Sequence, residues 1–162
     1  MIREKALYYV GQEEIPGNQG FKDKKFEELM KLTGWRQGQA WCAYFVELVW
    51  TQCGQDASLF SGSAVQTWRN FENSDKYVCS DIPDVGDIII WQMYRNGKAA
   101  WTGHAGIVIA IDNGVLVTVE GNTNSKGGRE GIEVAIKIRK VNYATNNGLR
   151  VKGFIKPIIH NP

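Results

Sequence analysis

The sequence predicts an α+β fold in which N-terminal helices pack on an antiparallel sheet of about five strands. Residues before Asp75 carry apolar side chains at helical spacing, whereas later residues form extended apolar segments separated by turns. Helices followed by strands, without alternation between the two, are typical of α+β domains. No internal repeat and no long linker divides the 162 residues. We therefore expect a single domain over residues 1–162.

Helices are expected throughout the first half of the chain. Apolar spacing predicts helices over Arg3–Val10 and Lys24–Leu32, and a serine cap predicts another over Ser61–Phe71. Residues 41–50 are apolar or aromatic except for Glu47. A helix that is hydrophobic on all sides belongs inside a domain. Residues 41–52 are therefore expected to form a central helix around which the remaining chain folds.

Strands are expected in the second half, separated by loops rich in glycine and asparagine. Residues 12–20 and 122–131 have the same loop composition. The segment Ile132–Lys140 alternates isoleucine and valine with charged side chains, which indicates a strand with one buried face and one charged face that includes Arg139. The expected strands are Gly86–Trp91, Gly103–Ile111, Val115–Glu120, Ile132–Lys140 and Val151–Ile155.

Composition argues against several classes of protein. A net charge of +2 gives no reason to expect binding to nucleic acid or to an anionic membrane. The spacing of the three cysteines matches no zinc pattern, and two histidines are too few to complete one. No acidic run resembles a calcium loop. We therefore expect no metal and no cofactor, while a disulfide between Cys53 and Cys79 remains open.

The N-terminal residues, Met1 to Gln12, lack the uninterrupted apolar core of a signal peptide. The longest apolar run, Ala105 to Ile111, is too short to span a bilayer. We expect synthesis in the cytoplasm, with release or export by another system.

Cys42 is the leading candidate for a nucleophile because it lies where the central helix should begin. The positive end of a helix dipole favours a thiolate, which is the reactive form of cysteine. Such a nucleophile needs a base within hydrogen-bonding reach. His104 opens a strand between Gly103 and Gly106, whereas His160 lies near the C-terminus, where fraying is common. His104 is therefore the better candidate.

The register of the hairpin after His104 decides which polar group can orient its ring. A two-residue loop would pair His104 with Thr123 and place Glu120 and Asn122 on the opposite face. A three-residue loop beginning at Asp112 would place His104 opposite Asn122, with Glu120 on the same side. Only this second register keeps Glu120 and Asn122 off the face that carries the isoleucines, and a buried face strongly specifies register. We favour it, with Glu120 ahead of Asn122 as the orienter.

The order of these residues resembles the CHAP family, the cysteine, histidine-dependent amidohydrolases/peptidases of the papain-like and NlpC/P60-like superfamily. The resemblance runs from about Ala6 to Pro157 and is greatest to a phage and prophage branch. It is carried by the order and spacing of five short blocks: Trp41-Cys42-Ala43-Tyr44-Phe45-Val46, Ser63-Ala64-Val65-Gln66-Thr67-Trp68, Val85-Gly86-Asp87-Ile88, Gly103-His104-Ala105-Gly106-Ile107-Val108 and Glu120-Gly121-Asn122-Thr123.

The resemblance implies a papain-like/NlpC-P60-like fold and metal-independent hydrolysis of peptidoglycan. The bond would be the amide between muramic acid and the stem peptide, or a peptide bond within or between stems. By position, Cys42 would be the nucleophile, His104 the base and Glu120 the acidic orienter, with Asn122 as a second polar residue. Many members have glutamine directly before the cysteine, where this chain has Trp41, so the oxyanion-hole side chain stays open.

Substrate and partner expectations follow from the same resemblance. Gln39, Trp41, Trp68 and Trp101 are candidates to bind substrate, although core packing is the default for at least two of the tryptophans. The expected partner is bacterial peptidoglycan, bound by a monomer that acts as a lysin or an exported cell-wall toxin. Targeting would come from the cleft or from a partner chain, and an immunity protein is a further candidate partner.

Two other functions compete with hydrolysis. An acyltransferase or transglutaminase-like enzyme would keep the same fold and the same cysteine and histidine, but would transfer the acyl group to an amine. A catalytically inactive cell-wall binding module would keep only the fold.

Overall fold

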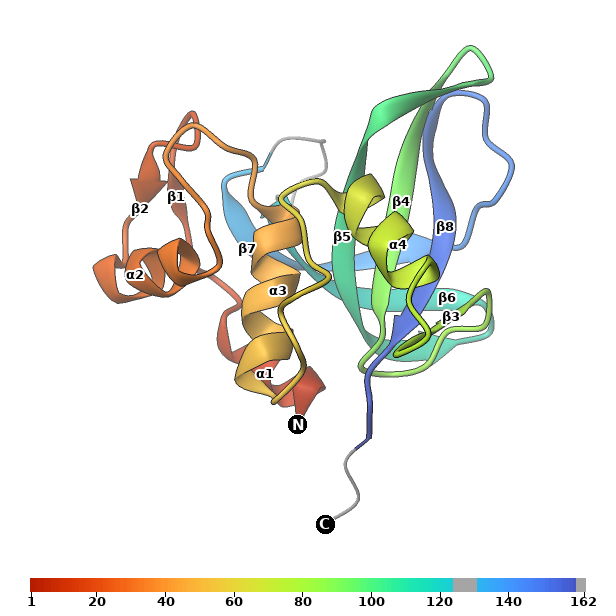
Figure 1. Cartoon of the computed structure of the whole chain (residues 1–162). Coiled ribbons are helices and arrows are strands. Elements are labelled where there is room, and N and C mark those ends of the chain that lie inside the picture. The colour runs from red at the N-terminus through yellow and green to blue at the C-terminus, as the bar shows by residue number, and fades with distance from the viewer. Residues whose placement is uncertain (124–130, 160–162) are drawn as a thin grey trace.

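The computed structural model of the chain describes residues 1–123 and 131–159 (Figure 1). His160, which was considered above, lies outside the described residues, as does most of the expected loop 122–131. In chain order the elements are α1 (Ile2–Tyr8), β1 (Glu14–Ile15), β2 (Gly20–Phe21), α2 (Lys24–Leu32), α3 (Cys42–Gln52), α4 (Ala64–Glu72), β3 (Val78–Ser80), β4 (Ile88–Arg95), β5 (Lys98–Asp112), β6 (Val115–Thr123), β7 (Glu133–Lys140) and β8 (Gly148–Lys156).

The expected fold class is confirmed. Within the described residues, the main sheet has six strands in the order β3-β8-β4-β5-β6-β7, and neighbouring strands run antiparallel. This is one strand more than about five, because β3 was not expected. Strands β1 and β2 form a separate small hairpin that begins in the segment 12–20, which was expected to be a loop, and ends at Phe21. Strands of two or three residues are too short to show a periodic pattern.

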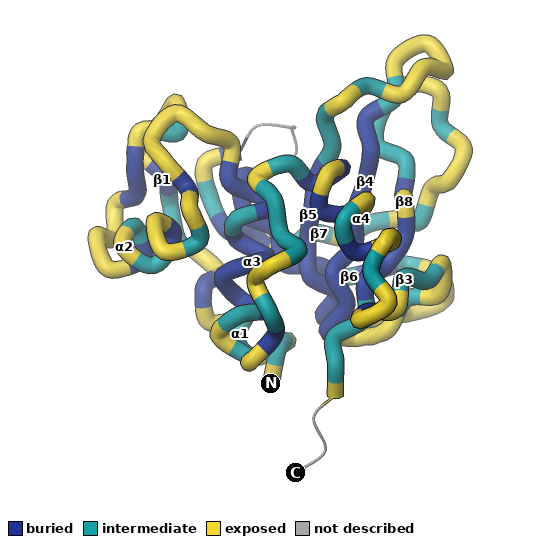
Figure 2. Tube along the Cα trace, viewed as in Figure 1, coloured by how far each residue is buried: buried dark blue, intermediate teal, exposed yellow. Residues whose placement is uncertain are grey.

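Helix α3 lies at the centre of the molecule, as its composition predicts. It packs against β5 and β6, while α4 covers β4 and β5, and α1 and α2 flank α3 (Figure 1). The side chains of Phe45, Val46, Val49 and Trp50 are fully buried. In Figure 2 the burial is concentrated in α3 and the middle of the sheet, whereas the tip of the β4–β5 hairpin is exposed.

The sheet has a separate core on each of its two sides. The larger one lies between the sheet and the helices and includes Ile107 and Val119. The smaller one lies on the other face and includes Trp91, Val108 and Leu116. The predicted sorting of alternate β5 and β6 residues between two faces is therefore confirmed for the residues beyond the bulge described next. It is wrong for Ala110 and Ile111, because Ala110 pairs with Val117 and Ile111 with Leu116.

The β5–β6 hairpin places His104 and Glu120 on the same face, as predicted, but with a different turn. Asp112 pairs with Val115, so the loop has two residues, not three, and the predicted turn is wrong. Asn113 and Gly114 adopt φ values of 48° and 77°, as a type I′ turn requires. A β-bulge then falls between Val108 and Ala110. The extra residue restores, beyond the bulge, the register that a three-residue loop would have produced.

The three cysteines are free thiols. No helix within residues 1–123 and 131–159 is long and apolar enough to cross a membrane.

Candidate active site

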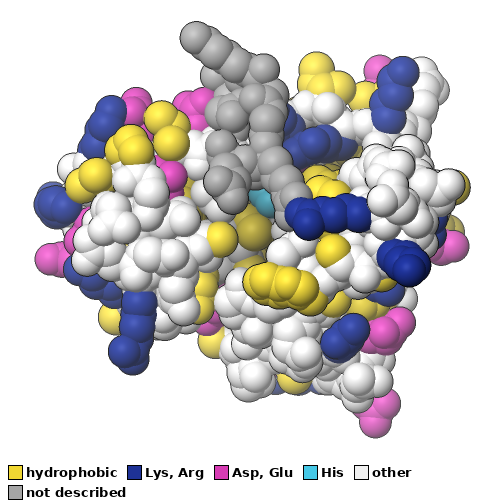
Figure 3. Space-filling model, turned by 90° about the horizontal axis from the view of Figure 1, so that it is seen from above, with side chains coloured by type: hydrophobic (Ala, Val, Ile, Leu, Met, Phe, Trp, Pro, Cys, Tyr) yellow, Lys and Arg dark blue, Asp and Glu magenta, His cyan; other side chains and the backbone are white. Residues whose placement is uncertain are grey.

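A cleft of about 750 Å³ opens where the N-terminus of α3 meets the sheet. It faces the viewer in Figure 3, where the space-filling surface is hollowed beside the residues drawn in grey. Strands β5 and β7 and the segment leading into β8 supply its walls. Its lining includes Ala40, Cys42, Trp101, His104, Asn122, Ile138, Arg139, Lys140, Asn142 and Asn147.

Cys42 is the first residue of α3 and opens into this cleft. The helix has no side-chain cap, so the amide groups of its first turn stay available as donors. The Cys42 sulfur lies beside His104 and the backbone amides of Ala43 and Ala105. Burial opposes the thiolate, but the charge of His104 and these neighbouring donors outweigh it and lower the pKa of Cys42.

His104 lies between Cys42 and Glu120. Its Nε2 lies 2.7 Å from Oε2 of Glu120, which leaves Nδ1 as the nitrogen for the thiol. Burial alone would lower the pKa of His104, yet the cysteine and the carboxylate together raise it well above its usual range. The lowered pKa of Cys42 and the raised pKa of His104 favour a thiolate–imidazolium pair at neutral pH.

Glu120 has no exposed surface, and its carboxylate has a full set of partners. Arg139 donates two hydrogen bonds, from Nε to Oε1 at 2.8 Å and from Nη2 to Oε2 at 2.6 Å. Thr118 donates its hydroxyl to Oε1 at 2.6 Å. Burial would raise the pKa of Glu120, but Arg139 and His104 lower it to about 2. Glycine at position 106 makes room for this carboxylate, because a Cβ there would lie 2.8 Å from Cγ of Glu120.

Arg139 and Trp91 are site residues that sequence reasoning missed or left undecided. Trp91 pairs with His104 across β4 and β5, and the two rings stack with centroids 5.5 Å apart. The guanidinium carbon of Arg139 lies 5.2 Å from the centre of the Trp91 ring. The charged series in Ile132–Lys140 was a signal for Arg139, but Ile136 and Ile138 are the exposed residues and Arg139 points inward. The expected burial of these two isoleucines is therefore wrong.

Asn122 lines the cleft beside the histidine but does not join its hydrogen-bonded chain. Nε2 of His104 is already bound to Glu120. Asn122 has the left-handed φ of 52°, and its backbone carbonyl accepts a hydrogen bond from Gly131. Among the described residues, its side chain has no hydrogen-bond partner, so the orienting contact is made by Glu120.

Two of the four substrate-binding candidates are core residues. Trp41 is fully buried among Phe21, Phe26 and Phe45, and its Nε1 donates to Glu14 at 2.7 Å. Trp68 is 6% exposed and belongs to the larger core. Both predictions of direct substrate contact are therefore wrong, because large aromatic side chains gain more from burial against the helices.

The other two candidates are exposed. Trp101 is 83% exposed on β5 and lines the cleft beyond His104. Gln39 is exposed, and its side-chain oxygen accepts hydrogen bonds from the backbone of Arg36 and from the Tyr44 hydroxyl. Gln37 donates its amide to Gln19. The two glutamines are therefore held by contacts with their own loop, with α3 and with the turn before β2.

Within the described parts of the chain, no group of three or more His, Cys, Asp or Glu side chains is placed to hold a metal ion. The donors around Cys42 are amide and imidazole groups that suit a thiolate and a developing oxyanion.

Comparison with known protein families identifies the family of this chain. The sequence model of the CHAP domain matches residues 34–122, more than half of the chain. The chain therefore belongs to the CHAP domain family, which is of the peptidoglycan hydrolase type. No curated protein and no solved structure matches the chain.

Proposed function

We propose that the protein is a cysteine peptidoglycan hydrolase that cleaves an amide bond. The bond is either the amide between N-acetylmuramic acid and the L-alanine of the stem peptide, or a peptide bond of the stem or cross-bridge. The observation that carries this proposal is the arrangement of Cys42 beside His104, whose ring is bonded to Glu120, at the uncapped start of a helix and open to a cleft. Nucleophile, base and orienter in this sequence suit acyl transfer through a covalent intermediate.

The reaction begins from the Cys42 thiolate, which attacks the carbonyl carbon of the substrate amide. The negative charge then moves to the carbonyl oxygen. Backbone amides at the start of α3, including that of Cys42 itself, stabilise this oxyanion, and each such donor contributes roughly 10²–10³ in rate.

The collapse of this intermediate needs a proton for the leaving group. Imidazolium at His104 gives it to the departing amine, which leaves a thioester on Cys42 and a neutral imidazole. The same imidazole next removes a proton from water, and the resulting hydroxide attacks the thioester carbonyl. The tetrahedral intermediate then breaks its C–S bond, which releases the acid product and restores the Cys42 thiolate beside the imidazolium. Glu120 keeps the ring oriented and stabilises its positive charge in both steps.

The cleft supplies the place for the polymer. Trp101 offers an exposed aromatic face beside the catalytic residues, which suits stacking against a sugar ring or a peptide group. The protein would act on the cell wall after release or export by another system. Each step above uses only groups of this chain and water, so hydrolysis is expected to need no metal.

The deciding experiment is digestion of purified peptidoglycan of several chemotypes by the native protein and by Cys42→Ala, in excess EDTA. Soluble products are identified by mass spectrometry. Release by the native protein alone supports the proposal, and the fragment masses name the bond. Equal release by both proteins would show that Cys42 is not the nucleophile. No release from any wall would contradict the proposal of peptidoglycan hydrolysis.

The same digestion separates hydrolysis from transfer. With an added primary amine, a transferase leaves that amine attached to the acyl product, whereas a hydrolase leaves a free carboxylate. Loss of activity in EDTA that calcium restores would contradict the metal-free mechanism.

A further inference from the structure

We propose that Arg139 is a positioning residue of the hydrolytic reaction, fixing His104 both through the Glu120 carboxylate and through the Trp91 ring. This inference rests on the proposed function, and it assigns a role to a residue on β7, the edge strand of the sheet beside β6. Arg139 is about a quarter exposed and lines the cleft, but its guanidinium is directed at groups that surround the base.

The first route runs through the carboxylate. Arg139 binds both oxygens of Glu120, at 2.8 and 2.6 Å, while Thr118 and His104 each bind one. Two parallel N–H donors on one carboxylate fix its plane as well as its position. Rotation of the carboxylate would break both bonds at once. The oxygen that meets Nε2 of His104 is therefore held in place from the opposite side.

The second route runs through the indole. Trp91 stacks on His104 with an angle of 28° between the ring planes, and the Arg139 guanidinium lies 5.2 Å from the same indole. Strands β5 and β6 separate β7 from β4 in the sheet, so the long side chain of Arg139 reaches this indole across two strands. The imidazole is thus confined at its edge by the carboxylate and at its face by the indole. Arg139 touches both of these supports.

A purely structural ion pair is the simpler interpretation, and it has different consequences. Exposed ion pairs contribute little to stability, but Glu120 has no exposed surface. Removing the arginine would leave a buried carboxylate with less compensation, and the pKa of Glu120 would rise because the largest lowering contribution comes from Arg139. Glu120 would then take up a proton at a higher pH and cease to support the imidazolium there.

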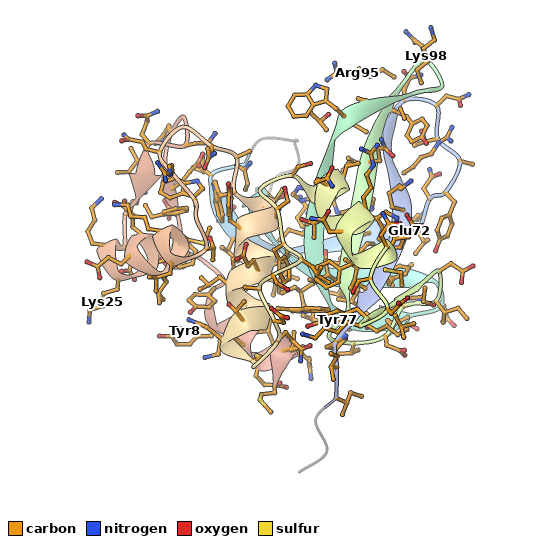
Figure 4. The ribbon with its side chains drawn as sticks, viewed as in Figure 1. Tyr8, Lys25, Glu72, Tyr77, Arg95 and Lys98 are labelled. Carbon is orange, nitrogen blue, oxygen red and sulfur yellow. The ribbon has the colours of Figure 1, made fainter. Side chains whose placement is uncertain are left out.

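The test uses Arg139→Gln, which removes the charge, and Arg139→Lys, which keeps the charge but loses the planar pair of donors. Arg95→Gln is the matched control, because it removes one arginine charge at the exposed tip of the β4–β5 hairpin (Figure 4). Two quantities are measured for each protein: kcat and KM on peptidoglycan, and the pH dependence of Cys42 alkylation by iodoacetamide, which needs no substrate.

For Arg139→Gln we expect kcat to fall roughly 10- to 100-fold, the usual effect of removing a group that orients a reacting residue, with KM little changed. The pH range in which the rate of Cys42 alkylation rises, the acidic limb of the profile, should move to higher pH. Arg139→Lys should return that limb toward the native position and recover only part of kcat. Arg95→Gln should behave like the native protein.

Two outcomes would overturn the proposal. One is an unchanged alkylation profile in both Arg139 variants, with rates reduced only in proportion to the folded fraction measured by circular dichroism. The other is full native kcat in Arg139→Gln. If the native protein releases nothing from any wall while the alkylation limbs still differ, the proposed function fails and the positioning of His104 by Arg139 stands.

Discussion

At the scale of single residues, the three cysteines differ in the charge state that their surroundings favour. Burial raises the pKa of Cys53, and it raises that of Cys79 to about 11. The pKa of Cys42 is lowered in spite of its burial, because His104 and two backbone amides stabilise the thiolate. Each unit of pKa changes the thiolate fraction about tenfold below the pKa, so small shifts separate the three thiols clearly.

We therefore predict that iodoacetamide at pH 6.5 alkylates Cys42 more than tenfold faster than Cys53 or Cys79. The rates are measured by mass spectrometry of peptides from quenched samples. Cys42→Ser should leave only the slow modification of the other two thiols. Similar rates at all three positions in the folded native protein would contradict the assignment of a thiolate to Cys42.

The sequence allowed the cysteine, the histidine and the glutamate to be named, because each has a local signal. Cys42 begins an all-apolar helix, His104 lies between glycines, and Glu120 shares a face with it. For Arg139 the signal was its place in the charged series of Ile132–Lys140, which was assigned to the exposed face. The alternation in its strand assigns isoleucines to the buried face, but Ile138 is 75% exposed. Arg139 meets Glu120 from the neighbouring strand and Trp91 from three strands away, and such contacts between strands leave no trace in the pattern of one strand.

At the scale of elements, the start of α3 is held against β6 by a close contact at Gly121. A Cβ at this position would lie 2.6 Å from Cζ3 of Trp41 and 2.8 Å from Cβ of Phe45. Both aromatic side chains are fully buried and cannot move aside. Glycine here lets the strand that carries Glu120 approach the helix that carries Cys42.

We predict that Gly121→Ala lowers the free energy of unfolding by about 1–3 kcal/mol, the usual range for an overpacked core. It should also reduce activity per folded molecule, because the added methyl group pushes the first turn of α3 away from His104. Urea denaturation gives the stability, and the alkylation rate of Cys42 reports the site.

Val117→Ala is the matched control on the same strand. Val117 packs at the border of the larger core, away from the first turn of α3. The Val117→Ala variant should lose stability without a change in the alkylation rate of Cys42. Equal loss of alkylation in both variants would show that general weakening of β6, rather than the contact at Gly121, disturbs the site.

The β5–β6 hairpin shows which part of an element can be read from its sequence. The position of His104 and Glu120 on the same face of the hairpin was predicted because the burial of one face permits only one register. The turn was predicted wrongly because the extra residue lies in a bulge near Ile109 rather than in the loop. A bulge and a longer loop sort the side chains identically beyond it, so the apolar pattern alone cannot distinguish them.

At the scale of the whole molecule, two buried carboxyl groups act on stability in opposite pH ranges. Burial raises the pKa of Glu47 to about 7, and among the described residues its side chain has no hydrogen bond or ion pair. The partners of Glu120 lower its pKa to about 2. Both groups start from an ordinary value of 4.5 in the unfolded chain. Their contributions to the free energy of unfolding therefore have opposite signs.

Between pH 2 and 4.5 the unfolded chain holds the proton at Glu120 and the folded chain does not, so stability rises with pH and is lost as pH falls toward 2. Between pH 4.5 and 7 the folded chain holds the proton at Glu47 and the unfolded chain does not, so stability falls as pH rises. These two groups together favour a maximum of stability near pH 4.5.

We predict that Glu47→Gln is more stable than the native protein at pH 8 and nearly equal to it at pH 4.5, because a neutral amide removes the unfavourable ionisation in the central helix. Urea denaturation followed by tryptophan fluorescence at both pH values measures the difference. Glu28→Gln, an exposed change on α2, should leave the difference between the two pH values unchanged. A Glu47→Gln protein that is less stable than the native one at pH 8 would mean that the carboxylate has a stabilising partner, and that α3 is held by charge as well as by apolar packing.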